Sequence, residues 1–238
     1  MAFNRLDKLL ADSGRFTRSE ARSAIRDGRV TVDGAAVRQP EAKYDGENVT
    51  ICADGEPVNC AEKRYFMLYK PAGVLSATDD KRQRTVLDLL PPEIRKLGLF
   101  PVGRLDKDTT GLLLLTNDGD LAHRVISPKK HVPKRYLAEL DGQPDSTDIA
   151  AFADGIVLSD GTNCLPAQLE LPEPGVGRVI VYEGKYHQVK RMFAARGYTV
   201  KALHREQIGA LALDGALQPG EYRELRAGEI EAAFQTEG

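Results

Sequence analysis

The most apolar run in this 238-residue chain is the four consecutive leucines Leu112–Leu115. The run is far shorter than the roughly 18 apolar residues that a membrane-spanning helix needs, so we interpret it as a strand anchored in a hydrophobic core. The chain is 42% hydrophobic and 29% charged, a composition typical of a folded protein with a proper core. Its first residues lack the apolar stretch of a secretory signal, so we expect a cytoplasmic protein.

A short loop ahead of the leucines, residues 103–111 with the sequence GRLDKDTTG, concentrates charged side chains. The glycines at its two ends allow tight turns and a close backbone approach to a ligand. A loop held at the end of a core strand is a common place for catalytic groups. A neighbouring cation, Arg104 or Lys107, would keep Asp106 ionised and available as a nucleophile or base. The residues alone leave the choice between Asp106 and Asp108 open, and a solvated salt bridge is the ordinary alternative.

The cysteines and histidines do not indicate a metal or redox centre. The three cysteines are odd in number and lack the close pairs of such a site, which predicts reduced thiols; they are Cys52, Cys60 and Cys164. The four histidines lack the spacing of metal ligands, and we predict no metal or catalytic role for them; they are His123, His131, His187 and His204.

The first 40 residues are locally basic, with eight Arg and Lys against five Asp and Glu, although the net charge of the chain is −2. Apolar spacing predicts one helix that Asn4 caps and Gly14 stops. A second helix should begin at Thr17, which forms a capping-box pair with Glu20, and end at Gly28.

An arginine stripe is expected on the second helix, because Arg18, Arg22 and Arg26 fall within an arc of about 80°. The ordinary interpretation of such a stripe is a solvated helix face, but the cluster also suits a phosphate backbone. The dipeptide Asp33-Gly34 then predicts the turn of a short β-hairpin.

This α-α-β segment, at about residues 3–50, resembles an S4 RNA-binding domain in RLDKLLADSG and in GRVTVDG. The resemblance implies an RNA partner held through basic side chains. The implied RNA-binding residues are Arg5, Lys8, Arg15, Arg18, Arg22, Arg26 and Arg29. Residues 52–64, rich in Gly, Pro and polar side chains, are interpreted as a linker. We therefore divide the chain into an S4-like domain with its linker at residues 1–60 and a catalytic domain at residues 61–238.

The second domain mixes strands and helices too irregularly for a doubly wound parallel sheet, so the predicted fold class is α+β. Pro71 should end the strand YFMLYK, because proline cannot donate to a sheet ladder. The helix near residues 189–196 should turn Val189, Met192 and Phe193 inward and end at Gly197.

The segment GRLDKDTTGLLLLTNDG resembles the signature of the pseudouridine synthases that act on the small ribosomal subunit, and of their relatives of types B, E and F that act on the large one. Three further segments resemble family motifs in the expected order: YKPAGVLS, KRYLAEL and EGKYHQVKRMFAARG. The resemblance spans nearly the whole chain and is strongest to the small-subunit group. It implies a small S4-like domain joined to a larger mixed or antiparallel sheet with a central cleft.

Residue roles follow from the positions of these motifs. The resemblance implies that Asp106 is the catalytic aspartate, with Tyr136 and Lys190 as its catalytic partners. Related groups carry arginine in place of this lysine, and Arg191 is the alternative cation. Leu203, Arg104 and Arg191 are the implied substrate-binding residues. Lys70 and Arg205 are weaker candidates for contact with the nucleotide.

Pseudouridine formation breaks the C1′–N1 bond of uridine, turns the base and rejoins it through C5, so we expect no cofactor and no metal. A carboxylate can attack C1′, add to C6 or remove a proton from C2′, and the resemblance does not choose among these routes. The implied partner is 16S small-subunit ribosomal RNA, modified at uridine 516 in an assembly intermediate, with a monomeric enzyme and no membrane. Action on 23S RNA, a non-catalytic S4-type assembly factor and a base-releasing glycosylase are the alternatives.

Overall fold

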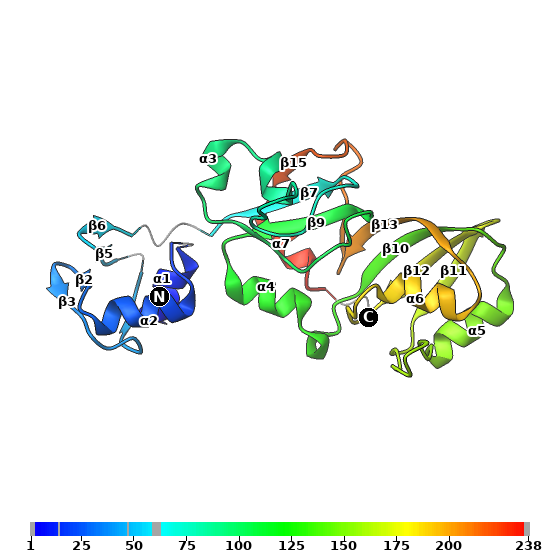
Figure 1. Cartoon of the computed structure of the whole chain (residues 1–238), viewed down its shortest axis with the longest axis horizontal. Coiled ribbons are helices and arrows are strands. Elements are labelled where there is room, and N and C mark those ends of the chain that lie inside the picture. Colours follow the sequence, from blue (N-terminus) through cyan, green and yellow to red (C-terminus); the bar gives the residue numbers. More distant parts are fainter. Residues whose placement is uncertain (1–2, 14, 47, 59–62, 236–238) are drawn as a thin grey trace. The chain divides into compact units, whose positions relative to one another are not determined.

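The computed structural model describes residues 3–13, 15–46, 48–58 and 63–235. The chain forms two compact units, coloured by sequence in Figure 1. Unit 1 comprises Met1–Arg64 with Pro91–Phe100 and Thr116–Gly119, and unit 2 comprises the remainder. Within the described ranges, no helix is long and apolar enough to cross a membrane.

Unit 1 packs its first two helices against short antiparallel strands. Its helices are α1 (Leu6–Asp12), α2 (Arg18–Arg26) and α3 (Pro92–Arg95). The strands β2 (Val30–Val32), β3 (Ala35–Ala36), β5 (Ile51–Ala53) and β6 (Glu56–Pro57) form one sheet, and β1 (Asn4–Arg5) pairs with β4 (Lys43–Tyr44). The core includes Leu6 and Leu10 of α1, Ile25 of α2 and Val30 of β2.

The local signals in unit 1 were mostly right. The Thr17 hydroxyl accepts a hydrogen bond from Glu20 N (3.2 Å) and Glu20 Oε2 accepts one from Thr17 N (2.7 Å), which confirms the capping box. Asp33 and Gly34 have φ values of 49° and 82°, as the predicted hairpin turn requires.

Two predictions for this region were wrong. Asn4 lies in β1 and does not cap α1, whose N-cap residue is Arg5. The predicted linker begins too early, because β5 and β6 pair across a turn within its first residues. Gly14, Cys60 and the rest of residues 59–62 lie outside the described residues.

Unit 2 is built on a mixed sheet with the order β11-β12-β10-β13-β9-β7-β15, to which β14 and β8 add at β13 and β9. The strands are β7 (Tyr65–Lys70), β8 (Phe100–Pro101), β9 (Thr110–Thr116), β10 (Lys134–Leu140), β11 (Gln168–Glu173), β12 (Val176–Val181), β13 (Val200–Ile208), β14 (Leu211–Ala212) and β15 (Tyr222–Glu224). The β9–β13 pair is parallel, whereas β10, β12 and β13 pair antiparallel. The α+β fold class is therefore confirmed.

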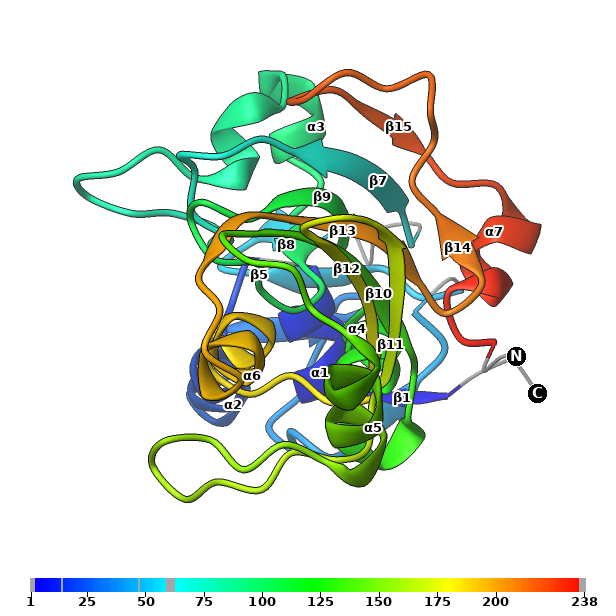
Figure 2. The same ribbon diagram turned by 90° about the vertical axis from the view of Figure 1, so that its right-hand side faces the viewer.

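Helices cover this sheet and connect its strands. They are η1 (Val86–Leu89), α4 (Gly119–Ile126), η2 (Pro128–Lys130), α5 (Ser146–Asp154), α6 (Gln188–Ala195) and α7 (Ala227–Ala232). Helices α5 and α6 lie on the same face of strands β10 and β12 (Figure 1, Figure 2). There Phe152 of α5 and Phe193 of α6 pack with their ring centroids 5.0 Å apart. This core fixes α6, which carries Lys190.

The leucine run forms the centre of β9, and Leu112–Leu115 are all buried, as predicted. The residue before it, Gly111, has a φ of +106° and lies opposite Arg205 of β13. A Cβ atom at this position would lie 2.3 Å from the Arg205 carbonyl oxygen, so only glycine fits. The charged loop therefore runs directly beside β13.

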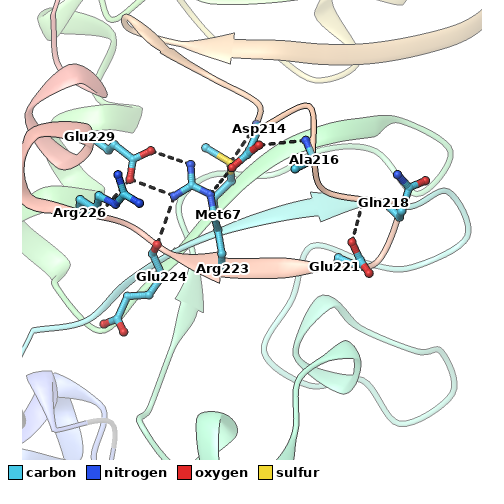
Figure 3. Close-up of polar contacts among 9 residues, drawn as sticks. All are labelled: Met67, Asp214, Ala216, Gln218, Glu221, Arg223, Glu224, Arg226 and Glu229. Atoms are coloured by element: carbon cyan, nitrogen blue, oxygen red, sulfur yellow. Dashed lines mark hydrogen bonds and ion pairs between the residues drawn. The ribbon is translucent and has the colours of Figure 1, made fainter.

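The last strand and helix of unit 2 are tied together by Arg223 (Figure 3). Its guanidinium bonds Asp214 (2.6 Å) and both carboxylate oxygens of Glu229 in α7 (2.6 and 2.9 Å). The hydrogen bonds from Arg223 lower the pKa of Glu229 to about 2. Because β15 pairs with β7, this cluster holds the strand that ends at Lys70.

Candidate active site

The charged loop and helix α6 bring Asp106 and Lys190 together. Lys190 Nζ lies 3.3 Å from Asp106 Oδ2 and 2.6 Å from Asp108 Oδ1. The Asp106 side chain is 26% exposed and that of Asp108 is 74% exposed, so Asp106 is the inner carboxylate. Burial would lower the pKa of Lys190, but the bond to Asp108 and the charge of Asp106 raise it above its ordinary value. The predicted cation is therefore protonated beside the predicted catalytic aspartate.

A buried lysine fixes the backbone of this loop. Lys70 is fully buried, and its ammonium donates to the carbonyl oxygens of Pro71 (3.1 Å), Lys107 (3.2 Å) and Thr109 (2.8 Å). Because an ammonium has three donors, Lys70 has none left for a nucleotide, and its predicted contact with the substrate was wrong. Burial lowers its pKa to about 8. Its position at the end of a buried strand was the sequence signal for this role.

A serine holds the opposite side of the loop. Ser76 Oγ accepts a hydrogen bond from Leu105 N (3.0 Å) and donates to Leu105 O (2.9 Å). Hydrogen bonds with Ser76 and Lys70 therefore fix the backbone on both sides of Asp106. This rigidity suits a carboxylate that must meet a reacting atom at a defined position.

Strands β10 and β13 form the floor beside the loop. Lys134 and Tyr136, two residues apart, point to the same face of β10. Tyr136 lies opposite Arg205 of β13. Arg205 is buried and donates to Leu112 O (2.8 Å) and to the Tyr136 hydroxyl (3.3 Å). Leu203, two residues before Arg205, is also buried and lines the space next to Asp106.

This floor carries buried positive charge. Arg205 Nη2 has no hydrogen-bond partner in the part of the chain that the structure describes. Burial, together with the charge of Arg205, lowers the pKa of Lys134 to about 8. Two neighbouring buried cations repel each other, so such a pair suits a site that receives an electron-rich ligand.

His187, for which we predicted no metal or catalytic role, also lies at the site. Its Nε2 atom is 3.5 Å from Asp106 Oδ1, and its ring stacks on that of Tyr186. The spacing of the histidines along the sequence gives no sign of this position, because His187 is not part of a metal-ligand pattern. The useful signal was its place three residues before Lys190, at the start of the same helix. Among the described residues no cluster of acids, histidines and cysteines could hold a metal ion.

A cavity of about 590 Å³ opens beside these groups. Its lining includes Arg104, Asp106, Lys134, Tyr136 and Arg205. The volume lies within the range of ligand pockets and suits a nucleotide. Arg104 is exposed on its wall, as a substrate-binding role requires. Arg191 lies next to the cavity rather than in its lining: it donates to the carbonyl oxygen of the cavity-lining Tyr186 (3.3 Å) and forms an ion pair with Asp160 (2.5 Å).

The basic side chains of unit 1 are more paired than the helix pattern suggested. The buried carboxylate of Asp7 bonds Arg5 (3.0 Å) and Arg22 (2.9 Å), and Arg18 lies 3.8 Å away. The three guanidinium groups stay substantially exposed, so Asp7 can position them and still leave them accessible to RNA.

Two further members of this basic set also have carboxylate partners. Arg29 pairs with Asp54 (2.6 Å), and Lys8 lies 4.0 Å from Asp12. Arg15 and Arg26 are exposed.

Both the catalytic region and the N-terminal region resemble known proteins. Residues 64–195 match the family model described as RNA pseudouridylate synthase, and residues 4–49 match the S4 domain. The chain is 47% identical over 230 residues to "Uncharacterized RNA pseudouridine synthase YtzG" of Bacillus subtilis, covering 95% of this chain and 96% of that protein.

Other relatives are similar over equally long stretches. "Ribosomal small subunit pseudouridine synthase A" of Escherichia coli K12 is 44% identical over 228 residues, covering 95% of this chain and 98% of that protein. A solved structure described as "Crystal structure of pseudouridylate synthase" is 41% identical with a TM-score of 0.71, covering 96% of this chain and 99% of that one. The family model covers more than half of the chain and these relatives match nearly all of it; the chain therefore belongs to the RNA pseudouridylate synthase family and carries an S4 domain.

Proposed function

We propose that this enzyme converts one uridine of 16S small-subunit ribosomal RNA to pseudouridine, with Asp106 as the reactive carboxylate. The observation that carries the proposal is the Asp106–Lys190 pair, 3.3 Å apart, at the edge of a cavity of nucleotide size. The small-subunit target rests on the similarity to proteins named ribosomal small subunit pseudouridine synthase A.

Lys190 and Tyr136 are the proposed catalytic partners of Asp106. Lys190 places a positive charge 3.3 Å from the Asp106 carboxylate, where it stabilises negative charge during the reaction. Tyr136 offers a ring on which the uracil stacks and a hydroxyl within hydrogen-bond reach of the turning base. Asp106 is partly exposed in the free enzyme, so the bound nucleotide must supply the cover that excludes water.

The remaining assigned residues hold the RNA. Leu203 packs under the base, and Arg104 and Arg191 contact the nucleotide or its phosphate. A base in a duplex cannot enter the cavity, so the target uridine is unpaired or flipped outward, which costs a few kcal/mol. Phosphate contacts by the basic residues of the S4 unit offset that cost.

The proposal also covers the domain organisation, the oligomeric state and the form of the substrate. We propose the domain division 1–60 and 61–238, a monomer acting in the cytoplasm, and an assembly intermediate of the small subunit as the substrate. Comparing naked 16S RNA with small-subunit assembly particles tests the last point. A higher kcat/KM on naked RNA would argue against the particle.

The decisive experiment maps pseudouridine chemically after incubation of the enzyme with 16S RNA or with assembly particles. We expect one modified uridine with the wild-type protein and none with Asp106→Ala. Product in 23S RNA alone would move the target to the large subunit, and free uracil would indicate a glycosylase. RNA binding with no product in either RNA would favour the assembly-factor alternative.

A further inference from the structure

Tyr186 stands out at the mouth of the cavity beside Asp106. It is 76% exposed, the largest exposed fraction among the large hydrophobic side chains of the described residues, and it lines the 590 Å³ cavity. A single exposed apolar side chain is ordinary on a protein surface. An exposed aromatic ring at the edge of an RNA enzyme's cavity is more informative, because unpaired bases bind by stacking on such rings.

The Tyr186 ring is held by its neighbour. It stacks on the His187 imidazole with the ring centroids 3.8 Å apart and an angle of 19° between the planes. His187 has a φ of 48°, a left-handed conformation that is uncommon outside glycine. The same imidazole points its Nε2 atom at Asp106, 3.5 Å away. One face of Tyr186 is therefore covered, and its position is tied to the reactive carboxylate.

The backbone around Tyr186 is also fixed. The buried Gln188 amide accepts from Lys185 N (2.9 Å) and donates to Glu183 Oε1 (2.9 Å), closing the turn that carries the ring. Arg191 Nη1 donates to Tyr186 O (3.3 Å). A ring held in this way loses little freedom when a ligand stacks on it, which favours binding.

From these contacts we infer that Tyr186, backed by His187, is a stacking platform for an unpaired nucleobase adjacent to the target uridine. The inference rests on the proposed function. The target base enters the cavity toward Tyr136, and the neighbouring base lies on the open face of Tyr186 at the rim. Arg104, exposed on the same cavity wall, suits the phosphate that joins the two nucleotides.

The platform predicts a defect in substrate binding that depends on the aromatic ring and not on the hydroxyl. Stacking of one base on an aromatic side chain contributes about 10-fold to 100-fold in affinity. Tyr186→Ala should therefore raise KM by about this factor with a smaller change in kcat, whereas Tyr186→Phe should stay close to wild type. Ile149→Ala, at an exposed apolar position on α5, is the matched control and should change neither constant.

A fluorescent base reports the contact directly. Substrate RNA carries 2-aminopurine immediately 5′ or immediately 3′ of the target uridine, and its fluorescence is followed during titration with the full-length protein. We expect quenching at one of the two positions with wild type and Tyr186→Phe, and its loss with Tyr186→Ala.

Two results would overturn the platform: wild-type KM and quenching in Tyr186→Ala, or equal damage in Tyr186→Phe and Tyr186→Ala. Thermal melting confirms that each variant is folded. Lack of product with the wild-type enzyme on this RNA would instead count against the proposed function. Normal wild-type product with an unaffected Tyr186→Ala would remove the platform alone.

Discussion

The ammonium group of Lys190 is 3.3 Å from Asp106, yet a second carboxylate, Asp108, holds the same group at 2.6 Å. The hydrogen bond from Lys190 lowers the pKa of Asp108, so both aspartates compete for one cation. Asp106 lines the cavity, whereas Asp108 is largely exposed, so we assign the reactive role to Asp106.

Exchanging each aspartate for asparagine should separate their roles. Asp106→Asn removes the reactive carboxylate, and we expect kcat to fall by about 10³-fold or more. Asp108→Asn only frees Lys190 to turn fully toward Asp106, so kcat should stay within about 10-fold of wild type. Single-turnover assays on 16S RNA measure both. A larger loss in Asp108→Asn than in Asp106→Asn would reverse the assignment made here.

The charge of Lys190 should matter more than its shape. Lys190→Met leaves Asp106 without its fixed cation, and we expect kcat to fall by about 10²-fold. Lys190→Arg keeps the charge and should recover most of the activity, since guanidinium also pairs well with carboxylate. The comparison of kcat between the two variants is the measurement. Equal activity in Lys190→Met and wild type would show that Asp106 needs no partner.

Local signals in the sequence predicted local structure well. The leucine run Leu112–Leu115 forms a buried strand, and Thr17 with Glu20 caps α2 as predicted. Such features depend on residues that are close together in the sequence, so a short segment is enough to predict them. The proximity of Asp106 and Lys190 was expected only through the family resemblance, because no local pattern joins a loop to a distant helix.

Contacts that depend on long-range topology were predicted only weakly, as for Arg205, or were missed, as for His187. Arg205 lies under the cavity because β9 pairs in parallel with β13. The spacing of apolar residues in the sequence does not predict which strands pair. His187 lies 3.5 Å from Asp106 with a left-handed backbone, a conformation that its residue type does not demand. The Asp7 cluster joins α1 to α2, whereas the helix-wheel argument considered one helix at a time.

Lys70 should act through the loop that it holds. Lys70→Met removes three hydrogen bonds to loop and strand carbonyls, and a shift of Asp106 by about 1 Å is enough to lower kcat by about 10²-fold. Lys129→Met is the matched control, because its side chain is exposed and lies outside the cavity lining, and it should keep near-wild-type activity. Hydrogen exchange at Thr109 N, which bonds Asp106 O, should rise only in Lys70→Met. Unchanged exchange there would contradict the anchoring role.

The alkaline side of the pH profile should report the buried lysines. Lys134 has a pKa of about 8, so it is charged below that pH and neutral above it. Because the neutral form removes positive charge from the cavity floor, kcat/KM should fall as pH rises through about 8. The fall should flatten in Lys134→Met, which has no proton to lose. A fall that survives unchanged in that variant would contradict the role of Lys134, and the same profile measured on Lys70→Met would test the other lysine with a pKa of about 8.

Asp7 should stabilise unit 1 in a pH-dependent way. Its burial would raise its pKa, but hydrogen bonds from Arg5 and Arg22 outweigh burial and lower it. A carboxyl group with a lowered pKa stabilises the fold above its unfolded value, near pH 4, and this contribution is lost as pH falls through the folded value. Asp7→Asn should therefore lower the free energy of unfolding of unit 1 by about 2 kcal/mol at neutral pH. This is less than the loss expected from breaking a fully buried ion pair, because the arginines still reach water.

Hydrogen exchange of the α1 amides in the full chain measures this cost. Asp12→Asn, which breaks the long contact with Lys8, should change the opening free energy by less than about 0.5 kcal/mol. The gap between wild type and Asp7→Asn should close as the medium is acidified below pH 4, because wild-type Asp7 then becomes neutral as well. A gap that persists in acid would mean that Asp7 acts through its shape and hydrogen bonds, and that its charge does not position the arginines.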